Sequence, residues 1–146
     1  MDTITIRPGD APDVEAFLAE RIYEYNARAT GYYDGETYSA IRRSGAGDIV
    51  AGVSGFTWGG CCYVSYLWVT EALRGTGIGR ELLTAVERHA RDRHCRLVLL
   101  STHDFQAPKF YARLGYEPIA RIDDYPAGHK DIFFAKRLER ETPQST

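Results

Sequence analysis

The sequence has little cysteine, no excess of basic charge and no long apolar run. Its three cysteines, Cys61, Cys62 and Cys95, are odd in number and lack the spacing of a metal site, so we expect reduced thiols, a cytoplasmic location and no bound metal. The formal net charge of −2 argues against a nucleic-acid partner, which normally demands a basic excess. No stretch approaches the roughly 20 apolar residues of a membrane span, so a membrane partner is not expected either.

What is present is typical of an ordinary globular domain, with 44% hydrophobic and 26% charged residues. A chain of 146 residues is long enough to bury a core, and it is most simply a single domain. We assign that domain to residues 1–140, and we expect the polar residues 141–146 to form a disordered tail.

Alternating and helical periodicities divide the chain into strands and helices. The expected strands cover residues 3–7, 38–43, 48–58, 61–69, 97–100, 116–122 and 130–136. The expected helices begin near Pro12 (capped by Asp10), at Ile78 and, as a short helix, at Pro108. Apolar residues on both faces of residues 61–69 place that strand centrally, and the unbroken apolar run at 97–100 suits a buried parallel strand.

The helix that begins at Ile78 has an apolar side and a charged side. The apolar stripe consists of Ile78, Leu82, Ala85, Val86, His89 and Ala90. The side expected to face water carries Arg80, Glu87, Arg91 and Asp92. In the strand at 48–58, Gly52 and Gly55 are expected to mark a bulge or a close packing approach.

A glycine-rich turn joins the central strand to this helix, and it opens with Arg74. Gly75, Gly77 and Gly79 let the backbone come close to a ligand and adopt torsions that a Cβ would forbid. The helix N-terminus adds unpaired N–H groups and a partial positive charge, and Arg74 and Arg80 add guanidinium groups that suit phosphate oxygens. The turn is therefore predicted to hold a phosphate or a pyrophosphate.

Spacing separates three kinds of phosphate-binding turn. A nucleoside-triphosphate loop needs lysine and then serine or threonine, where this chain has arginine and glutamate at 80–81. A dinucleotide fingerprint needs G-x-G-x-x-G and an acidic residue after the next strand, where this chain has serine and threonine at 101–102. The pattern present, Arg74-x-x-Gly77-x-Gly79, resembles the pyrophosphate loop of the GNAT family of N-acetyltransferases.

A second motif supports the same resemblance. Residues 107–116 read A-x-x-F-Y-x-x-x-G-Y, which is similar to a later signature of the family, in the family's order. The chain from Phe105 to the final strand also resembles a subgroup of unassigned bacterial members that have a Tyr/Phe-Pro-x-Gly-His loop. One departure is Asp104, which stands where the family has an asparagine that helps to hold the pantetheine arm. An ionised Asp104 accepts hydrogen bonds but donates none, which puts its cofactor role in question.

The resemblance implies an α+β fold of the three-layer α/β sandwich type, and it makes residues 1–140 one acetyltransferase domain. Its central sheet would be mixed and mostly antiparallel, with a splayed parallel strand pair and helices on both faces. The resemblance also implies acetyl-coenzyme A as co-substrate, and it is compatible with a homodimer, which no sequence feature requires. The implied cofactor-binding residues are Leu67, Trp68, Val69, Arg74, Gly75, Thr76, Gly77, Ile78, Gly79, Arg80, Asp104, Ala107 and Tyr111.

Amide formation from a thioester needs an uncharged amine, a stabilised carbonyl oxygen and a proton for the leaving thiolate. Backbone groups of residues 67–69 are suited to polarise the thioester oxygen. Tyr111 matches the family tyrosine near the coenzyme sulfur and is predicted to be the catalytic acid, with Tyr66 as a second catalytic residue. The general base is open, and the candidates are Tyr66, His103, Asp123, Asp124 and His129, or a water chain ending on one of them.

The acceptor is predicted to be the primary amine of a small molecule, attacked directly in a ternary complex. Aromatic walls with nearby carboxylates suit a cationic amine. The aromatic residues concerned are Tyr23, Tyr25, Tyr32, Tyr33, Trp58, Tyr66, Trp68 and Tyr125, and the carboxylates are Asp34, Glu36, Asp123 and Asp124. Two alternatives stay open at this point: acetylation of protein lysines or N-termini, and a non-catalytic module that binds acyl-coenzyme A.

Overall fold

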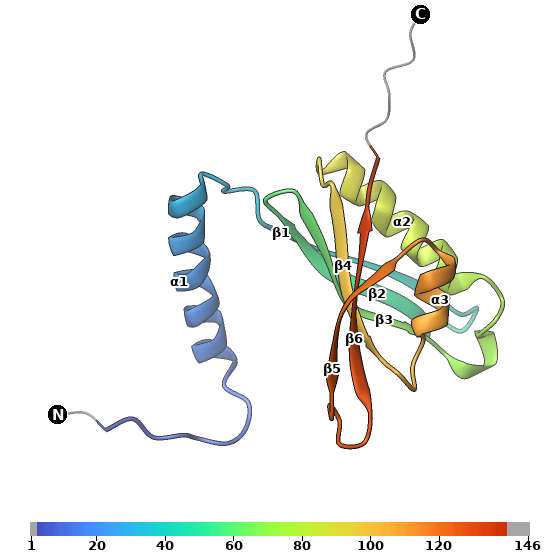
Figure 1. The fold of residues 1–146 in the computed structure, drawn as a ribbon, viewed down its shortest axis with the longest axis horizontal. Helices are drawn as coiled ribbons and strands as arrows, with labels where there is room; N and C mark the ends of the chain where they lie inside the picture. Colours follow the sequence, from blue (N-terminus) through green and yellow to red (C-terminus); the bar gives the residue numbers. More distant parts are fainter. Residues whose placement is uncertain (1–2, 140–146) are drawn as a thin grey trace, which may run out of the picture. The chain divides into compact units, whose positions relative to one another are not determined.

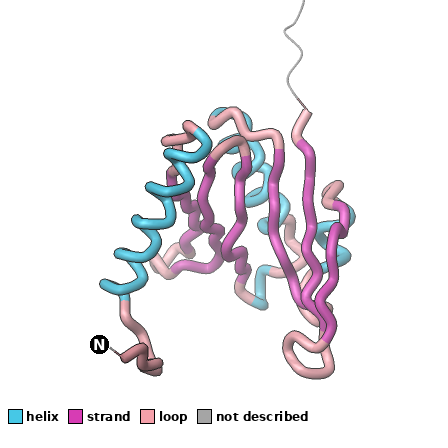
Figure 2. Tube along the Cα trace, turned by 60° about the vertical axis from the view of Figure 1, so that its left-hand side comes forward, coloured by secondary structure: helices cyan, strands magenta, loops and turns pink. Residues whose placement is uncertain are grey.

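A computed structural model describes residues 3–139 of the chain, which divide into two compact units at residues 33 and 34. In the first unit the regular element is α1 (Pro12–Thr30), drawn in cyan in Figure 2. Pro12 stands in the first turn of α1, and Gly31, at φ 80°, ends the helix by donating its N–H to the Ala27 carbonyl at 2.7 Å. The helix predicted from Pro12 is confirmed.

Two expectations for the first unit are wrong. Residues 3–7 form no strand, because alternation alone does not make one and no strand of the described chain pairs with them. Asp10 is not the cap of α1: Ala11 occupies that position and its side chain makes no capping hydrogen bond. The helix starts instead with Pro12, which has no N–H to satisfy, and with the acidic residues Asp13 and Glu15 beside its positive end.

The second unit is a six-stranded mixed sheet with two α-helices, as Figure 1 shows. The strand order is β1-β2-β3-β4-β6-β5, and every neighbouring pair is antiparallel except β3 with β4. The bounds are β1 Glu36–Arg43, β2 Ile49–Trp58, β3 Cys61–Val69, β4 Leu97–His103, β5 Glu117–Asp123 and β6 Lys130–Arg137, with α2 at Ile78–Asp92 and α3 at Pro108–Arg113. The predicted α+β class and these six predicted strands are confirmed. Residues 141–146, the predicted tail, lie outside the described range.

The core of the second unit lies between the sheet and α2. Alternate residues of four strands point into it: Ala51, Val53, Cys62, Val64, Val98, Leu100 and Phe134. In α2, Leu83 is fully buried, whereas Ala85 of the expected stripe is exposed. Within residues 3–139, no helix has the length and the low charge that crossing a membrane requires.

The parallel pair β3–β4 is short. Three residue pairs join the strands, the last being Tyr63 with Leu99. Just beyond, the register of β3 against β2 shifts by one residue, which leaves Ser65 as a bulge. Because a bulge bends its strand, β3 parts from β4 at this point. The splayed parallel pair that the sequence predicts is present here.

A glycine in the neighbouring strand makes room at this bulge. A Cβ on Gly55 would collide with the carbonyl oxygen of Tyr63. Because that space is open, the Tyr38 hydroxyl lies over Gly55 and donates a 2.8 Å hydrogen bond to the same carbonyl. Gly55 therefore marks both a register shift and a close approach, as the sequence predicts.

The expectation that Glu87 faces water is wrong. Its side chain is buried, and it accepts hydrogen bonds from Lys136 Nζ at 2.7 Å and from the Tyr116 hydroxyl at 3.2 Å. Lys136 Nζ also donates to the Leu114 carbonyl at 2.9 Å. The helical period correctly predicts that α2 has a polar side. Glu87 on that side is nevertheless covered, because Lys136 of β6 and Tyr116 after α3 bond to it.

Buried phenols should make the fold sensitive to alkali. Burial raises the pKa of Tyr38 and of Tyr116, and the Glu87 carboxylate adds to the rise in Tyr116. The folded chain therefore keeps these protons above a pH of about 10, where the unfolded chain loses them. We expect the free energy of unfolding to fall as the pH rises through this range, by up to about 1.4 kcal/mol per pH unit for each tyrosine. Urea denaturation across the range should give a shallower slope for Tyr38→Phe, and equal slopes would contradict this.

Candidate active site

The glycine-rich turn leads from β3 to α2 through a single turn of 3-10 helix, η1 (Glu71–Leu73). Gly75 and Gly77 have φ values of 76° and 92°, in the left-handed region that strains residues with a Cβ. The first hydrogen bond of α2 runs from the Glu81 N–H to the Gly77 carbonyl. The N–H groups of residues 78–80 precede that bond and have no acceptor within the helix, so they can donate to an anion.

Two side chains hold the turn in shape. Arg74 Nε donates to the Val69 carbonyl at 3.1 Å, and the Thr76 hydroxyl donates to the Leu73 carbonyl at 2.5 Å. The first of these bonds ties the arginine to the last residue of β3. Arg74 and Arg80 are both exposed, so their remaining guanidinium N–H groups are accessible near the start of α2. The predicted pyrophosphate-binding residues thus lie in the turn at 74–77 and in the first residues of α2, 78–80, and their role stays a prediction.

Gly79 serves a packing role between the two helices. A Cβ there would lie 3.1 Å from Cζ of Phe110 in α3, closer than side chains normally pack. Glycine at this position therefore lets α3 lie against the first turn of α2. The helix that carries Tyr111 is thereby held beside the predicted pyrophosphate site.

Tyr111 lies on the core side of the sheet. Its side chain is 7% exposed, and its ring centre is 5.9 Å from that of Tyr116 and 6.0 Å from that of Phe134. Burial raises the pKa of Tyr111. Since the phenol then stays protonated at neutral pH, this residue is suited to give a proton rather than to take one.

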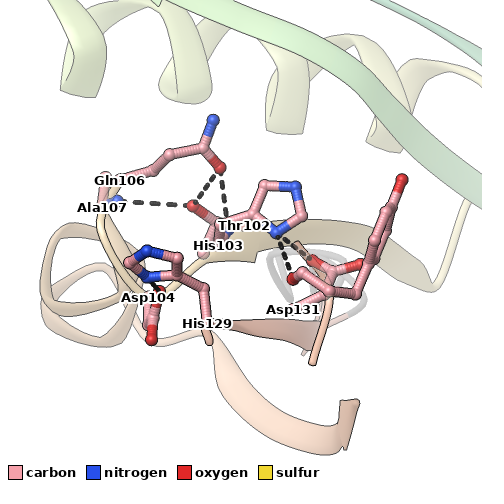
Figure 3. Close-up of polar contacts among 8 residues, drawn as sticks. Thr102, His103, Asp104, Gln106, Ala107, His129 and Asp131 are labelled. Atoms are coloured by element: carbon pink, nitrogen blue, oxygen red, sulfur yellow. Dashed lines mark hydrogen bonds and ion pairs between the residues drawn. The ribbon is translucent and has the colours of Figure 1, made fainter. Parts of the chain in front are cut away.

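Figure 3 shows how the start of α3 is fixed to the end of β4. Thr102, which is 4% exposed, accepts a 3.3 Å hydrogen bond from the Ala107 N–H and donates one of 3.3 Å to Gln106 Oε1. Gln106 Oε1 also accepts the N–H of His103 at 2.7 Å. These bonds fold the segment between β4 and α3 back onto the strand, so Thr102 sets the position of α3.

Replacing Thr102 by valine should therefore affect both stability and activity. Valine has a similar shape, but it leaves the Ala107 N–H and the Gln106 side-chain oxygen without their hydrogen bonds to the Thr102 hydroxyl. We therefore expect a loss of about 1–2 kcal/mol in the free energy of unfolding. The shifted α3 should also lower kcat several-fold. Chemical denaturation and initial rates measure the two effects. Thr84→Val is the matched control, because Thr84 is exposed and its hydroxyl donates within α2, to the Arg80 carbonyl.

Asp104 follows β4 and is paired with a histidine. Its Oδ1 lies 3.1 Å from His129 Nδ1, and its backbone N–H donates to the Lys130 carbonyl at 3.0 Å. A carboxylate only accepts hydrogen bonds, so His129 carries its proton on Nδ1. The pair joins the end of β4 to the β5–β6 loop, and the role of Asp104 toward a cofactor stays a prediction.

The other predicted carboxylates make contacts that shape the fold. Asp124 Oδ1 accepts the Gly128 N–H at 2.8 Å within the β5–β6 loop, and Asp123 forms an exposed ion pair with Arg121 at 3.2 Å. Asp34 and Glu36 face other partners: Asp34 accepts the Gly59 N–H at 3.0 Å, and Glu36 lies 3.8 Å from Arg93. None of these described contacts points to a role in proton transfer.

A buried carboxylate that sequence reasoning missed lies beside His103. Asp131 of β6 stands opposite His103 of β4 in the sheet, and its Oδ1 is 3.7 Å from His103 Nδ1. It is 5% exposed. The sequence offers no indication of this pair, because both residues read as ordinary polar positions at strand ends.

Tyr66 and Trp68 lie on the sheet face opposite the core. Leu67 and Val69 pack against the core, so the residues that alternate with them project the other way, with Tyr66 77% exposed and Trp68 50% exposed. His103 shares this face, because its neighbour Thr102 points to the core side. The tyrosines at 23, 25, 32 and 33 belong to the first unit.

The sheet is mixed, its one parallel pair, β3–β4, splays apart, and a glycine-rich turn leads from β3 into α2. These features define the acetyltransferase class of fold. The family model described as Acetyltransferase (GNAT) family matches residues 7–116, and the chain belongs to that family. This confirms the predicted family and the assignment as an acyltransferase.

Three relatives place the chain within the family. It is 36% identical over 104 residues to blasticidin-S acetyltransferase of Streptomyces morookaense, covering 70% of this chain and 76% of that one. It is 32% identical over 131 residues to acetyltransferase Atu2258 of Agrobacterium fabrum, covering 88% and 96%. The crystal structure of an acetyltransferase from Bacillus cereus superposes with a TM-score of 0.78 at 31% identity, over 92% of this chain and 98% of that one.

Proposed function

We propose that this chain transfers the acetyl group of acetyl-coenzyme A to the primary amine of a small molecule, by direct attack within a ternary complex. One observation carries the proposal: the glycine-rich turn, with its N–H donors and two arginines, follows the strand that parts from β4. A diphosphate held at this turn would direct the thioester into the gap between the two strands.

The chain's own residues take the following roles. N–H groups of residues 78–80 bind the pyrophosphate together with Arg74 and Arg80. Backbone groups of residues 67–69, freed where β3 parts from β4, bind the pantetheine and polarise the thioester oxygen. Ala107 and Asp104, which follow β4, lie along the other side of the pantetheine arm. Tyr111 gives its proton to the departing thiolate, and Tyr66 lies on the acceptor side.

Direct attack is supported by the state of the cysteines. Cys61, Cys62 and Cys95 are free, and burial raises the pKa of each thiol, to about 11 for Cys95. Neutral thiols are poor nucleophiles, which disfavours an acetyl-cysteine intermediate. Free thiols also suit a reducing compartment, so a cytoplasmic location is part of the proposal.

A small cationic acceptor is supported by two features. The relative named for blasticidin S acts on a small molecule, and the face that carries Tyr66 and Trp68 presents aromatic surface. Aromatic faces attract ammonium groups. A homodimer remains a prediction.

A panel of acceptors tests the proposal. Purified chain, acetyl-coenzyme A and a thiol reagent would be combined in turn with blasticidin S, putrescine, an amino-acid ester, a lysine-containing peptide and a neutral alcohol. We expect thiol release with one or more of the small amines. Turnover confined to the peptide would favour a protein acetyltransferase, and binding of acetyl-coenzyme A without turnover would favour a non-catalytic module. Activity confined to the alcohol would refute amine transfer.

A further inference from the structure

His103 and Asp131 form a cross-strand pair that the roles above leave unused. Oδ1 of Asp131 is buried and accepts no hydrogen bond from the described residues, although His103 Nδ1 is 3.7 Å away. A buried carboxylate oxygen without a hydrogen-bond partner costs free energy. That cost falls when a neighbouring group becomes positively charged. A second proton on the facing imidazole would give the carboxylate a charged partner, because it turns the 3.7 Å contact into an ion pair.

A second contact indicates which nitrogen of the neutral His103 ring carries the hydrogen. His103 Nδ1 lies 3.1 Å from the backbone carbonyl of Tyr125, an oxygen that can only accept. Nδ1 therefore carries the hydrogen, and Nε2 keeps its lone pair. Figure 3 shows Nε2 on the side of the ring that points away from Asp131. The ring thus presents a basic nitrogen outward and a buried carboxylate behind it.

Aromatic neighbours hold the ring in this orientation. Phe105 stacks on it with ring centres 5.4 Å apart and planes 10° apart, and Tyr125 meets its edge at 5.1 Å. The His103 side chain is 24% exposed, so it remains accessible despite these contacts. A fixed and partly exposed imidazole backed by a carboxylate is the arrangement of a general base.

The position of His103 in the sheet fits the proposed reaction. Thr102 and His103 end β4 and point to opposite faces, Thr102 toward α3 with Tyr111, and His103 toward the face of Tyr66. A thioester in the gap between β3 and β4 would therefore have the acid on one side and this imidazole on the other. Acyl transfer needs a base at the attacking nitrogen and an acid at the departing sulfur, and these two residues could fill the two roles.

We propose that His103 Nε2 is the base that takes a proton from the acceptor ammonium, and that Asp131 is a positioning residue that partners the resulting imidazolium. This inference rests on the proposed function. The ammonium gives one proton to Nε2, and its nitrogen attacks the thioester carbon, so that a C–N bond forms and the C–S bond breaks. Tyr111 protonates the thiolate and recovers a proton from water, and the attacking nitrogen gives its second proton to water as the amide forms. His103 releases its proton to water, which leaves amide, free coenzyme A and one proton.

The neighbouring histidine is a matched alternative. His129 also pairs its Nδ1 with a carboxylate, Asp104, but its side chain is 48% exposed and that carboxylate is 33% exposed. Its ring also contacts Phe105, in a T-shaped arrangement with ring centres 4.9 Å apart. The ionisable groups around His103 are therefore Asp131 from β6, the Tyr125 phenol from the β5–β6 loop, and the Asp104–His129 pair, which shares the Phe105 ring as a neighbour.

The test compares His103→Asn with His129→Asn, using the primary alkylamine of the acceptor panel that has the highest kcat/KM. Asparagine can still donate to the Tyr125 carbonyl, but it has no basic nitrogen. At pH 7 we expect His103→Asn to lower kcat/KM about 100-fold. Without a base only the uncharged amine reacts, so the variant's kcat/KM should rise about tenfold per pH unit toward the amine pKa of about 10. Its deficit should therefore shrink to a few-fold, while calorimetric affinity for coenzyme A stays unchanged.

Several outcomes would overturn the inference. A deficit that is constant with pH would indicate a structural role, and the same pH-dependent deficit in His129→Asn or Tyr66→Phe would give the role to another residue. Should His103→Asn fail to fold, His103→Gln and a ¹⁵N spectrum of the wild-type imidazole replace it, and a hydrogen found on Nε2 of the neutral ring would contradict the proposal. If the wild type acetylates no amine, the proposed function itself fails, which is distinguishable from loss of the base alone.

Discussion

Replacing Lys136 with methionine is expected to lower the free energy of unfolding by about 3 kcal/mol. The side chain of Glu87 is only 11% exposed, and Lys136 Nζ at 2.7 Å is its charged partner. Removing the lysine leaves a buried carboxylate that keeps only the Tyr116 hydroxyl, and it also removes the donor to the Leu114 carbonyl. Urea denaturation at neutral pH measures the loss.

Two further variants test this explanation. Arg42→Met removes an ion pair with Glu81 of similar length, 3.0 Å, but both side chains are more than half exposed, so its effect should be below about 1 kcal/mol. The double variant Glu87→Leu with Lys136→Met removes both charges together and should recover most of the stability. If Lys136→Met costs no more than Arg42→Met, the buried pair does not stabilise the fold as described.

Replacing Tyr111 with phenylalanine is expected to lower kcat about 100-fold, the usual contribution of a general acid. The substitution removes only the hydroxyl and keeps the ring packed against Tyr116 and Phe134. Because burial raises the pKa of Tyr111, the wild-type phenol holds the proton that the thiolate needs at neutral pH. Steady-state rates with acetyl-coenzyme A and the best amine of the panel provide the measurement.

Tyr116→Phe is the matched control for this variant. It also removes one hydroxyl from a buried tyrosine on the same side of the sheet, but that hydroxyl donates to Glu87. We expect it to reduce stability and to leave kcat within about twofold, in keeping with the small cost of a hydrogen bond away from the reaction. Wild-type kcat in Tyr111→Phe would remove the proposed acid.

The order of strands and helices in the second unit was predictable because local patterns determine it. The apolar run at 97–100 and the helical stripe after Ile78 each specify their element without help from distant residues. Residues 3–7 show the limit of this reasoning, because a strand exists only if another strand pairs with it. Glu87 shows a second limit: its partner in β6 is far away in the sequence, so the helical period assigned it to water.

The candidate site was predictable where it depends on a continuous segment. The turn at 74–80 contains its own glycines, arginines and helix start, so the sequence displays it whole. Asp131 was not predictable, because its meeting with His103 depends on the register of β4 against β6. The bulge at Ser65 was likewise indicated only through the glycine opposite it, Gly55.

The most direct test of the account is calorimetric titration of acetyl-coenzyme A into the wild-type chain and into the double variant Arg74→Ala, Arg80→Ala. We predict measurable binding to the wild type and a loss of about tenfold in affinity per arginine, as expected for charge-assisted hydrogen bonds. Arg91→Ala, which removes a charge from the far end of α2, should leave the affinity unchanged. The absence of heat with the wild type, or equal affinity in the double variant, would contradict the assignment of the turn as the coenzyme site.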